Sequence, residues 1–170
     1  MRLTDHEWWG LIHGMGLGAL FLLAFAGGMA DLYGLRTALV TTTGIKERMR
    51  RLKIGVTGMA VVAWLTVITG TWVVYPWYRE QTPDSPRSQL VANEDTAGWH
   101  EFGMEWKEHL AWISPILATA VAFIVLYYGD QLIRHQRVRR TTMLLFSLAF
   151  AFAAVAGAFG ALITKVAPVT

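Results

Sequence analysis

Four long apolar segments constrain this chain more than any other feature of its sequence. They lie at residues 8–33, 54–78, 110–133 and 142–163. Each supplies roughly the 20 residues that a helix needs to cross about 30 Å of hydrocarbon. None alternates apolar and polar residues with a period of two, and each is far longer than a barrel strand. The sequence therefore predicts an all-α membrane protein, with residues 1–170 forming one four-transmembrane-helix bundle.

Charge divides the connections between these segments into two kinds. Ten of the 15 Lys and Arg residues lie in segments 34–53 and 134–141, whereas segment 79–108 holds three basic and seven acidic residues. Because basic loops stay in the cytoplasm, we expect these two segments to be inner loops, with an outer loop at 79–98 and both termini outside. The helices then cover about residues 8–33, 54–78, 99–133 and 142–163. Topology and contact with lipid headgroups explain the net charge of +3, so no nucleic-acid partner is expected.

The start of the chain and its lack of cysteine narrow the class further. The first apolar segment lacks the basic region of a signal peptide and is too long for one, so we expect the first helix to stay in the mature protein. We expect that protein to be a multi-pass protein of the bacterial cytoplasmic membrane. With no cysteine, disulfides, thiolate-bound iron–sulfur clusters and c-type haem attachment are excluded within this chain. Helices 1 and 3 each end in an acidic residue followed by a basic one. This pattern suggests two repeated helical hairpins, although ordinary membrane composition also produces it.

Tryptophan is distributed unevenly along the predicted helices. Seven of the eight tryptophans fall near the outer ends, and only Trp64 lies at mid-membrane depth. Interfacial aromatic residues are expected on both sides of a membrane. The excess on one side indicates a binding site near the outer face.

The histidines are confined to two of the four helices and one inner loop. His6 and His13 belong to helix 1, His100 and His109 to helix 3, and His135 to the inner loop. An ionisable side chain within a span is costly and suggests a functional site. At about 100° per residue, His100 and His109 lie on opposite faces of a regular helix. We therefore expect His13 and His109, at matching depth, to face each other across the bundle.

Two imidazoles facing each other across a bundle favour a haem iron. Imidazole is a good ligand for haem iron, and two axial imidazoles favour electron transfer over oxygen binding. We expect one bis-histidine haem b near the outer face, with His13 and His109 as axial ligands. Its propionates would turn to the outer face, where Arg79 or Lys107 would pair with them.

Other ligand sets remain open from the sequence. His6 and His100 would hold a second haem if helix 3 is broken near its start. Met15 and Met104, together with the two proposed axial histidines, would instead form a copper site of imidazole and thioether ligands. In a third interpretation the chain is a cofactor-free structural subunit whose histidines are hydrogen-bonded interfacial residues.

The arrangement resembles small membrane-bound b-type cytochromes, four-helix bundles in which histidines on two spans hold haem b. The resemblance is carried by His13 in Leu-Ile-His-Gly-Met-Gly and His109 in Lys-Glu-His-Leu-Ala-Trp. Two-haem members of that group have histidines near both faces, whereas the inner halves of these helices have none. We therefore expect an electron-transfer subunit of an oxidoreductase complex rather than an enzyme acting alone. It would pass electrons on one side of the membrane between quinol and a neighbouring subunit or periplasmic carrier, and a bound quinone is compatible with that role.

Overall fold

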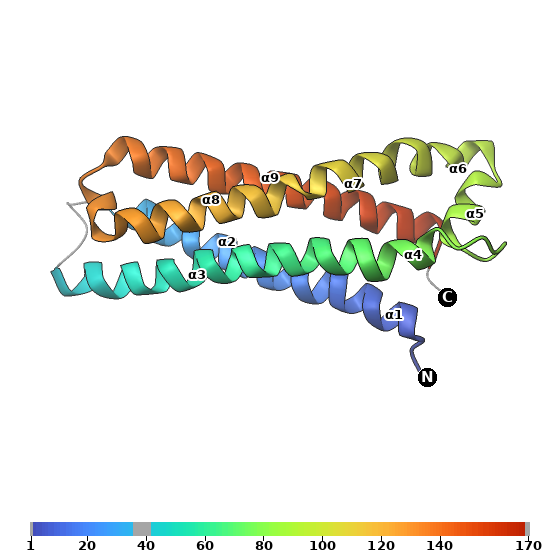
Figure 1. Cartoon of the computed structure of the whole chain (residues 1–170), viewed down its shortest axis with the longest axis horizontal. Helices are drawn as coiled ribbons and strands as arrows, with labels where there is room; N and C mark the ends of the chain where they lie inside the picture. The colour runs from blue at the N-terminus through green and yellow to red at the C-terminus, as the bar shows by residue number, and fades with distance from the viewer. Residues whose placement is uncertain (1, 36–41, 169–170) are drawn as a thin grey trace.

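The structure, a computed structural model, describes residues 2–35 and 42–168 and is a bundle of four helical spans (Figure 1). The spans are Asp5–Gly34, Gly44–Tyr78, Glu94–Ile133 and Gln136–Val166, here called spans 1 to 4. All four are long and apolar enough to cross a membrane. The described residues contain no strand. The predicted all-α four-helix architecture is therefore confirmed, and the chain is a multi-pass membrane protein.

The spans are built from consecutive helical elements. Span 1 contains α1 (Asp5–Gly10), η1 (Leu11–Gly16) and α2 (Leu17–Gly34). Span 2 contains α3 (Thr42–Thr69), η2 (Gly70–Val74) and α4 (Tyr75–Tyr78). Span 3 contains α6 (Glu94–Gly98), η3 (Trp99–Met104), α7 (Glu105–Ala111), α8 (Ile113–Tyr128) and the 3-10 turn η4 (Gly129–Ile133), and span 4 is α9 (Gln136–Val166). The connection between spans 2 and 3 carries one further helix, α5 (Pro86–Val91).

The predicted loops are more helical than expected. Helix α3 starts 12 residues before the predicted residue 54, because segment 45–53 consists of good helix formers without Gly or Pro. Residues 36–41 of the predicted inner loop lie outside the described residues. The predicted outer loop 79–98 contains α5 and α6, whose first turns are capped by the side chains of Ser85 and Asn93.

Three of the spans change from α-helical to π-helical hydrogen bonding toward the same end of the bundle. The π-helical segments are η1, η2 and η3. A π-helical turn bonds residue i to i+5 and often occurs at functional sites. Each of these segments also rotates the following residues away from the phase of a continuous α-helix.

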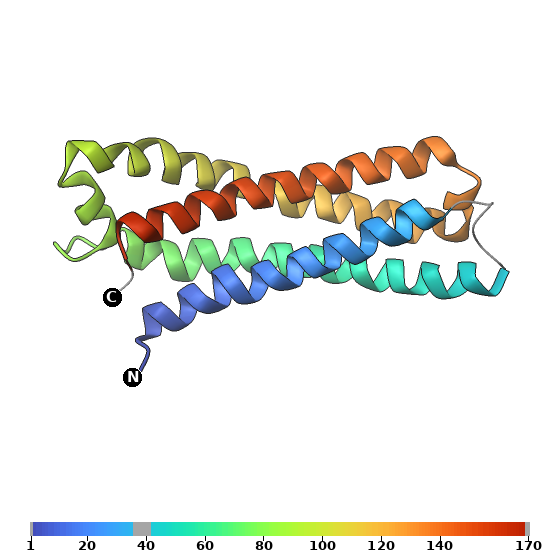
Figure 2. The ribbon, with the colours of Figure 1, turned by 180° about the vertical axis from the view of Figure 1, so that it is seen from behind.

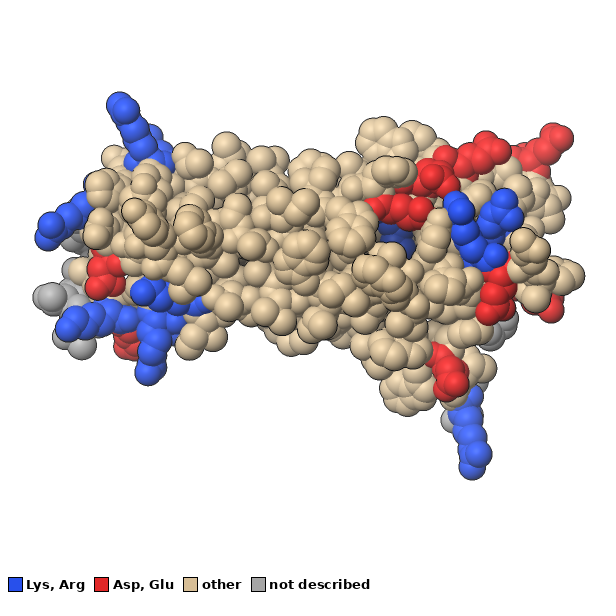
Figure 3. All heavy atoms as spheres, in the orientation of Figure 1, with Lys and Arg blue, Asp and Glu red and all other residues tan. Residues whose placement is uncertain are grey.

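Charge separates the two ends of the bundle (Figure 3). Lys and Arg gather at one end, most Asp and Glu lie at the other, and the middle of this face shows no charged side chain. Both termini lie at the acidic end (Figure 1), which the positive-inside rule assigns to the outer side. This end, here called the acidic end, includes residues 79–98.

Packing is tighter toward the basic end than toward the acidic end. The main core cluster joins all four spans, and Phe146 of span 4 fits so closely against Gly28 of span 1 that a Cβ there would lie 2.8 Å from the ring. Only 6% of the most apolar window of span 1 is buried, against 22–33% in the other spans. Figure 2 shows why: span 1 crosses the bundle obliquely, and its start stands away from the other helices.

A tryptophan at mid-membrane depth forms a hydrogen bond between spans 2 and 3. The indole Nε1 of Trp64 donates to Oγ1 of Thr119 at 3.0 Å. We expect Thr119→Val to lower the free energy of unfolding by about 0.6 kcal/mol, a typical value for interhelical bonds in membranes. Denaturant unfolding in micelles measures this loss. Thr57→Val, at an exposed position of span 2, is the control, and an equal effect of both variants would contradict the prediction.

Candidate functional site

A cavity of about 450 Å³ lies inside the half of the bundle nearer the acidic end. All four spans line it, mostly with apolar side chains and glycines. Its volume falls in the usual range for ligand pockets, about 300–1,000 Å³. The ionisable and hydroxyl side chains in its wall include His13, Tyr75, Lys107, Glu108 and Ser114. An apolar pocket with a few converging polar groups is the expected form of a binding site.

His13 enters this cavity from the π-helical segment of span 1. Its Nδ1 lies 3.0 Å from Oγ1 of Thr69 on span 2. The Thr69 hydroxyl donates its single hydrogen to backbone carbonyls of its own helix, with Leu65 O at 2.8 Å, so toward the imidazole it accepts. In the neutral ring, Nδ1 therefore carries the proton and Nε2 keeps a lone pair. The imidazole can accept a proton or bind a metal through Nε2.

A glycine on span 2 makes room for this imidazole. A Cβ added to Gly70 would lie 2.9 Å from Cε1 of His13 and 3.5 Å from Nε2. Real Cβ atoms do not approach that closely, so any larger residue would displace the ring. Thr69 and Gly70, neighbours on span 2, therefore both determine the position of His13.

Glu108 and Ser114 line the cavity, and each has a buried polar atom that the protein leaves unpaired. Oε1 of Glu108 and Oγ of Ser114 are buried and have no hydrogen-bond partner among the described residues. Five threonines in the spans donate to the carbonyl four residues earlier, namely Thr66, Thr69, Thr119, Thr142 and Thr164. Ser114 does not, although this bond normally satisfies a hydroxyl within a helix. Buried polar atoms of this kind are usually paired. A third unpaired atom, Nε1 of Trp77, belongs to a residue outside the cavity, whereas Glu108 and Ser114 both line it, so a ligand in the cavity is their candidate partner.

Two further side chains complete the polar wall of the cavity. The Tyr75 hydroxyl lies beside the Glu108 carboxyl group. The Lys107 ammonium packs over Gly160 of span 4 and interacts electrostatically with both His13 and Glu108. No described carboxylate forms an ion pair with it. The cavity therefore offers an imidazole, a carboxyl group and a cation to the same occupant.

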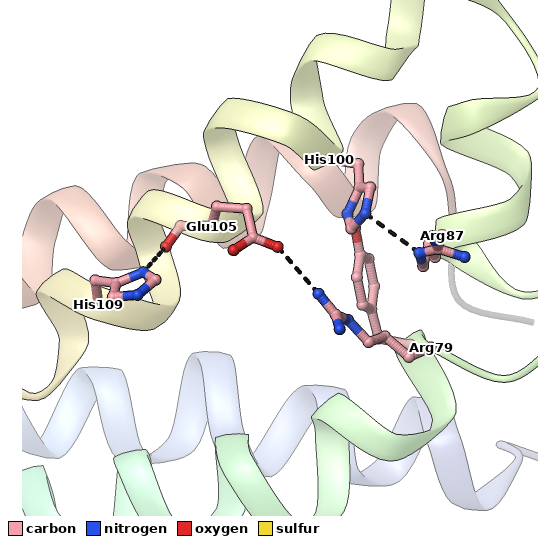
Figure 4. A network of polar contacts seen from close by, with 6 residues as sticks. Arg79, Arg87, His100, Glu105 and His109 are labelled. Atoms are coloured by element: carbon pink, nitrogen blue, oxygen red, sulfur yellow. Dashed lines mark hydrogen bonds and ion pairs between the residues drawn. The ribbon is translucent and has the colours of Figure 1, made fainter.

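His109 lies outside the cavity, contrary to the expectation that it faces His13. Its side chain is exposed, and Nδ1 donates to the backbone carbonyl of Glu105 at 2.6 Å (Figure 4). Its neighbours Lys107 and Glu108 line the cavity instead. The structure thus brings His13 together with this pair and not with His109.

Arg79, the other expected propionate contact, is also outside the cavity. Its guanidinium pairs with the Glu105 carboxylate at 3.0 Å and lies 4.8 Å from the centre of the Tyr75 ring. Both members of the ion pair are partly exposed. Of the two predicted propionate partners, only Lys107 lines the cavity.

His100 is buried, with both ring nitrogens engaged (Figure 4). Nε of Arg87 donates to its Nε2 at 3.2 Å, and its Nδ1 lies 3.0 Å from the Tyr78 hydroxyl. Because Arg is always a donor, Nε2 accepts and Nδ1–H donates to Tyr78. His6 is stacked on Trp77 with ring centres 5.1 Å apart. Because both ring nitrogens of His100 are already hydrogen-bonded, neither is free to bind a second haem, and the role of His100 is structural.

The two candidate methionines are separated as well. Met104 is 4% exposed and lines the cavity with His13, whereas Met15 is 70% exposed. Among residues 2–35 and 42–168, no group of three or more His, Asp and Glu side chains is arranged to hold a metal ion. The four predicted copper ligands are therefore not gathered at one place.

Sequence reasoning missed Glu108, Tyr75 and Ser114 as site residues. A signal for Glu108 existed, since residues 104, 108, 111 and 115 follow the spacing of one helix face and all line the cavity. Tyr75 and Ser114 carry no such signal, because their role depends on which spans pack together.

No protein-family model, curated protein or solved structure matches this chain. Chemically, the cavity suits an apolar molecule whose edge carries hydrogen-bonding oxygens and that exchanges protons with His13 and Glu108.

Proposed function

We propose that this chain is an electron-transfer subunit of a membrane redox complex, and that its cavity binds the headgroup of a lipid-soluble quinol or quinone. The observation that carries the proposal is the pair of unpaired buried atoms, Glu108 Oε1 and Ser114 Oγ. Leaving such an atom unpaired costs about 1–3 kcal/mol. The quinone ring is apolar with oxygens at its rim, so it would fill the cavity. A quinol hydroxyl would donate to the Glu108 carboxylate, a quinone oxygen would accept from the protonated Glu108 carboxyl group, and in both forms the Ser114 hydroxyl would donate to a ring oxygen.

The side chains of the wall suit quinol oxidation. In that reaction the quinol gives up two electrons and two protons and becomes a quinone. His13, through Nε2, and Glu108, as a carboxylate, would each accept one proton. The Lys107 ammonium would stabilise negative charge on a quinol oxygen as its proton leaves. The electrons would pass one at a time to a metal centre of a neighbouring subunit or a periplasmic carrier.

A haem b is a second candidate for the same cavity, favoured by the state of His13. An imidazole that donates through Nδ1 and keeps its lone pair on Nε2 suits an axial ligand. The Met104 thioether is the candidate second ligand, and Lys107 the candidate propionate partner. Haem leaves Glu108 and Ser114 without an evident role, which is why we favour the quinol. Both occupants would need the space beside His13, so they exclude each other.

Quinone binding tests the first candidate. The probe is a benzoquinone with a decyl tail, titrated into the protein in lipid nanodiscs. Binding is measured by quenching of the cavity-lining Trp112, with Trp112→Phe giving the background. We expect saturable binding at one site, weakened about fivefold by Glu108→Leu, because one hydrogen bond contributes about 0.5–1.5 kcal/mol.

Glu101→Leu is the matched control, because Glu101 is an exposed carboxylate on the same span. It should leave the affinity unchanged. Absence of saturable binding to the wild-type protein, or equal losses in the two variants, would reject the quinol proposal.

An absorbance spectrum tests the second candidate. If haem b occupies the cavity, protein purified from haem-supplied cells shows a reduced α-band. His13→Ala would abolish this band, whereas His109→Ala would keep it, because His109 lies outside the cavity. Loss of the band in His109→Ala would restore the bis-histidine arrangement expected from the sequence.

A further inference from the structure

The cavity reaches the lipid-facing surface between spans 1 and 4. Gly14 and Gly18 on span 1, and Ala154 and Gly157 on span 4, line the cavity and are also exposed. A Cβ added to any of these three glycines would meet no atom within 4 Å. These four small residues, here called the portal, therefore border open space.

The portal is closed toward the basic end by aromatic side chains. Phe25 of span 1 stacks on Phe150 of span 4, with ring centres 4.3 Å apart and planes 10° apart. Phe21 stacks on the same ring at 6.4 Å. Beyond them Gly28 contacts Phe146 directly. The opening is thus confined to the half of the bundle that holds the polar wall.

Resting on the proposed function, we infer that the portal is a lateral entrance from the membrane, and that the hydrocarbon tail of the bound quinol lies in it. The headgroup then pairs with Glu108 and Ser114 while the tail extends between spans 1 and 4 into lipid. The substrate class is accordingly a quinol with a long apolar chain. A polar, water-soluble hydroquinone would approach from water and not from lipid, so it would not enter through an opening at this depth.

Packing of span 1 supports this inference. Its low burial means that few apolar contacts hold it against the bundle, so it is the wall that is displaced at least cost. Small residues spaced by four often let helices approach closely, but no atom lies within 4 Å of a Cβ added at Gly14 or Gly18. The unpaired atoms in the cavity behind them favour a ligand tail as the occupant over a second helix.

The test fills the portal without touching the polar wall. Gly14→Leu and Gly157→Leu would place a side chain in the opening, and both should fold because no atom lies near either Cβ position. Gly27→Leu is the matched control, since Gly27 is an exposed glycine of span 1 with open space around it and does not line the cavity. Each protein is titrated with the decyl-tailed benzoquinone and with the same ring lacking the tail.

We expect the two portal variants to weaken binding of the tailed ligand about fivefold and to leave the tailless ligand within about twofold, since about 1 kcal/mol of lost contact gives a fivefold change. Gly27→Leu should change neither. If the wild-type protein binds both ligands and the portal variants leave tailed binding intact, the entrance is wrong and the proposed function stands. If the wild-type protein binds neither, both fail. If the wild-type protein is a dimer and Gly14→Leu abolishes that dimer with ligand binding unchanged, the portal instead belongs to an interface with a second copy of the chain.

Discussion

Gly70→Ala is expected to weaken binding of the decyl-tailed benzoquinone about 30-fold, which corresponds to about 2 kcal/mol. The new methyl group would lie 2.9 Å from Cε1 of His13, and the ring cannot stay in place at that distance. Displacement of the imidazole would break its 3.0 Å contact with Thr69 and move the ring into the space that the ligand would occupy. The substitution thus removes both a hydrogen-bonding partner and part of the cavity volume.

Gly58→Ala separates this steric effect from the general effect of alanine in a helix. Gly58 lies on the same span, and a Cβ there would meet no atom within 4 Å. Both substitutions change helix propensity alike, so only Gly70→Ala should alter affinity. The titration used for Glu108→Leu measures both. Equal affinities for the two variants would show that the position of His13 does not matter for binding.

The four spans could be predicted from the sequence because hydropathy and length are local properties. A segment of about 20 apolar residues has few alternatives to a transmembrane helix. The uneven distribution of Lys and Arg among the loops between spans can likewise be counted from the sequence alone. The structure shows the expected separation of charge between the two ends of the bundle (Figure 3). The helix ends were less predictable, as α3 shows, because basic residues with good helix propensity extend a span beyond the apolar region.

Helical phase failed to predict which histidine of span 3 is buried. A regular helix places His100 and His109 on opposite faces, and the structure does bury one and expose the other. The choice between them was wrong, because His100 is buried by contacts with Tyr78 of span 2 and Arg87 of α5. A count of 100° per residue does not show which face of the helix those contacts cover.

The polar wall of the cavity depends on contacts between spans that no single helix reveals. In the sequence alone, Ser114 is an ordinary serine of a helical segment, and Glu108 is one of several acidic residues near the predicted outer face. Their importance follows from burial without a partner, which requires knowing how spans 2, 3 and 4 pack. The sequence could identify His13 as a candidate site residue, because an ionisable side chain within a membrane is costly. It could not identify the side chains that lie beside His13 in the cavity.

Ser114→Ala is expected to stabilise the empty protein and weaken the ligand at the same time. Ser114 is 3% exposed and its hydroxyl is unpaired, so removing the hydroxyl should raise the free energy of unfolding by about 1 kcal/mol. For a chain of this size that corresponds to roughly 3 °C in melting temperature. Loss of its bond to the quinone oxygen should lower affinity about fivefold.

Thermal unfolding with and without the decyl-tailed benzoquinone measures both effects in one experiment. The variant should melt higher than the wild-type protein when empty and gain less when the ligand is added, because ligand stabilisation follows the ratio of concentration to dissociation constant. Ser147→Ala, at an exposed position of span 4, should change neither value. A Ser114→Ala protein that is less stable when empty would mean that the hydroxyl is already paired within the fold, and the strongest argument for a hydrogen-bonding ligand would then be lost. Opposite signs in the two measurements are what distinguish a residue kept for binding from one kept for packing.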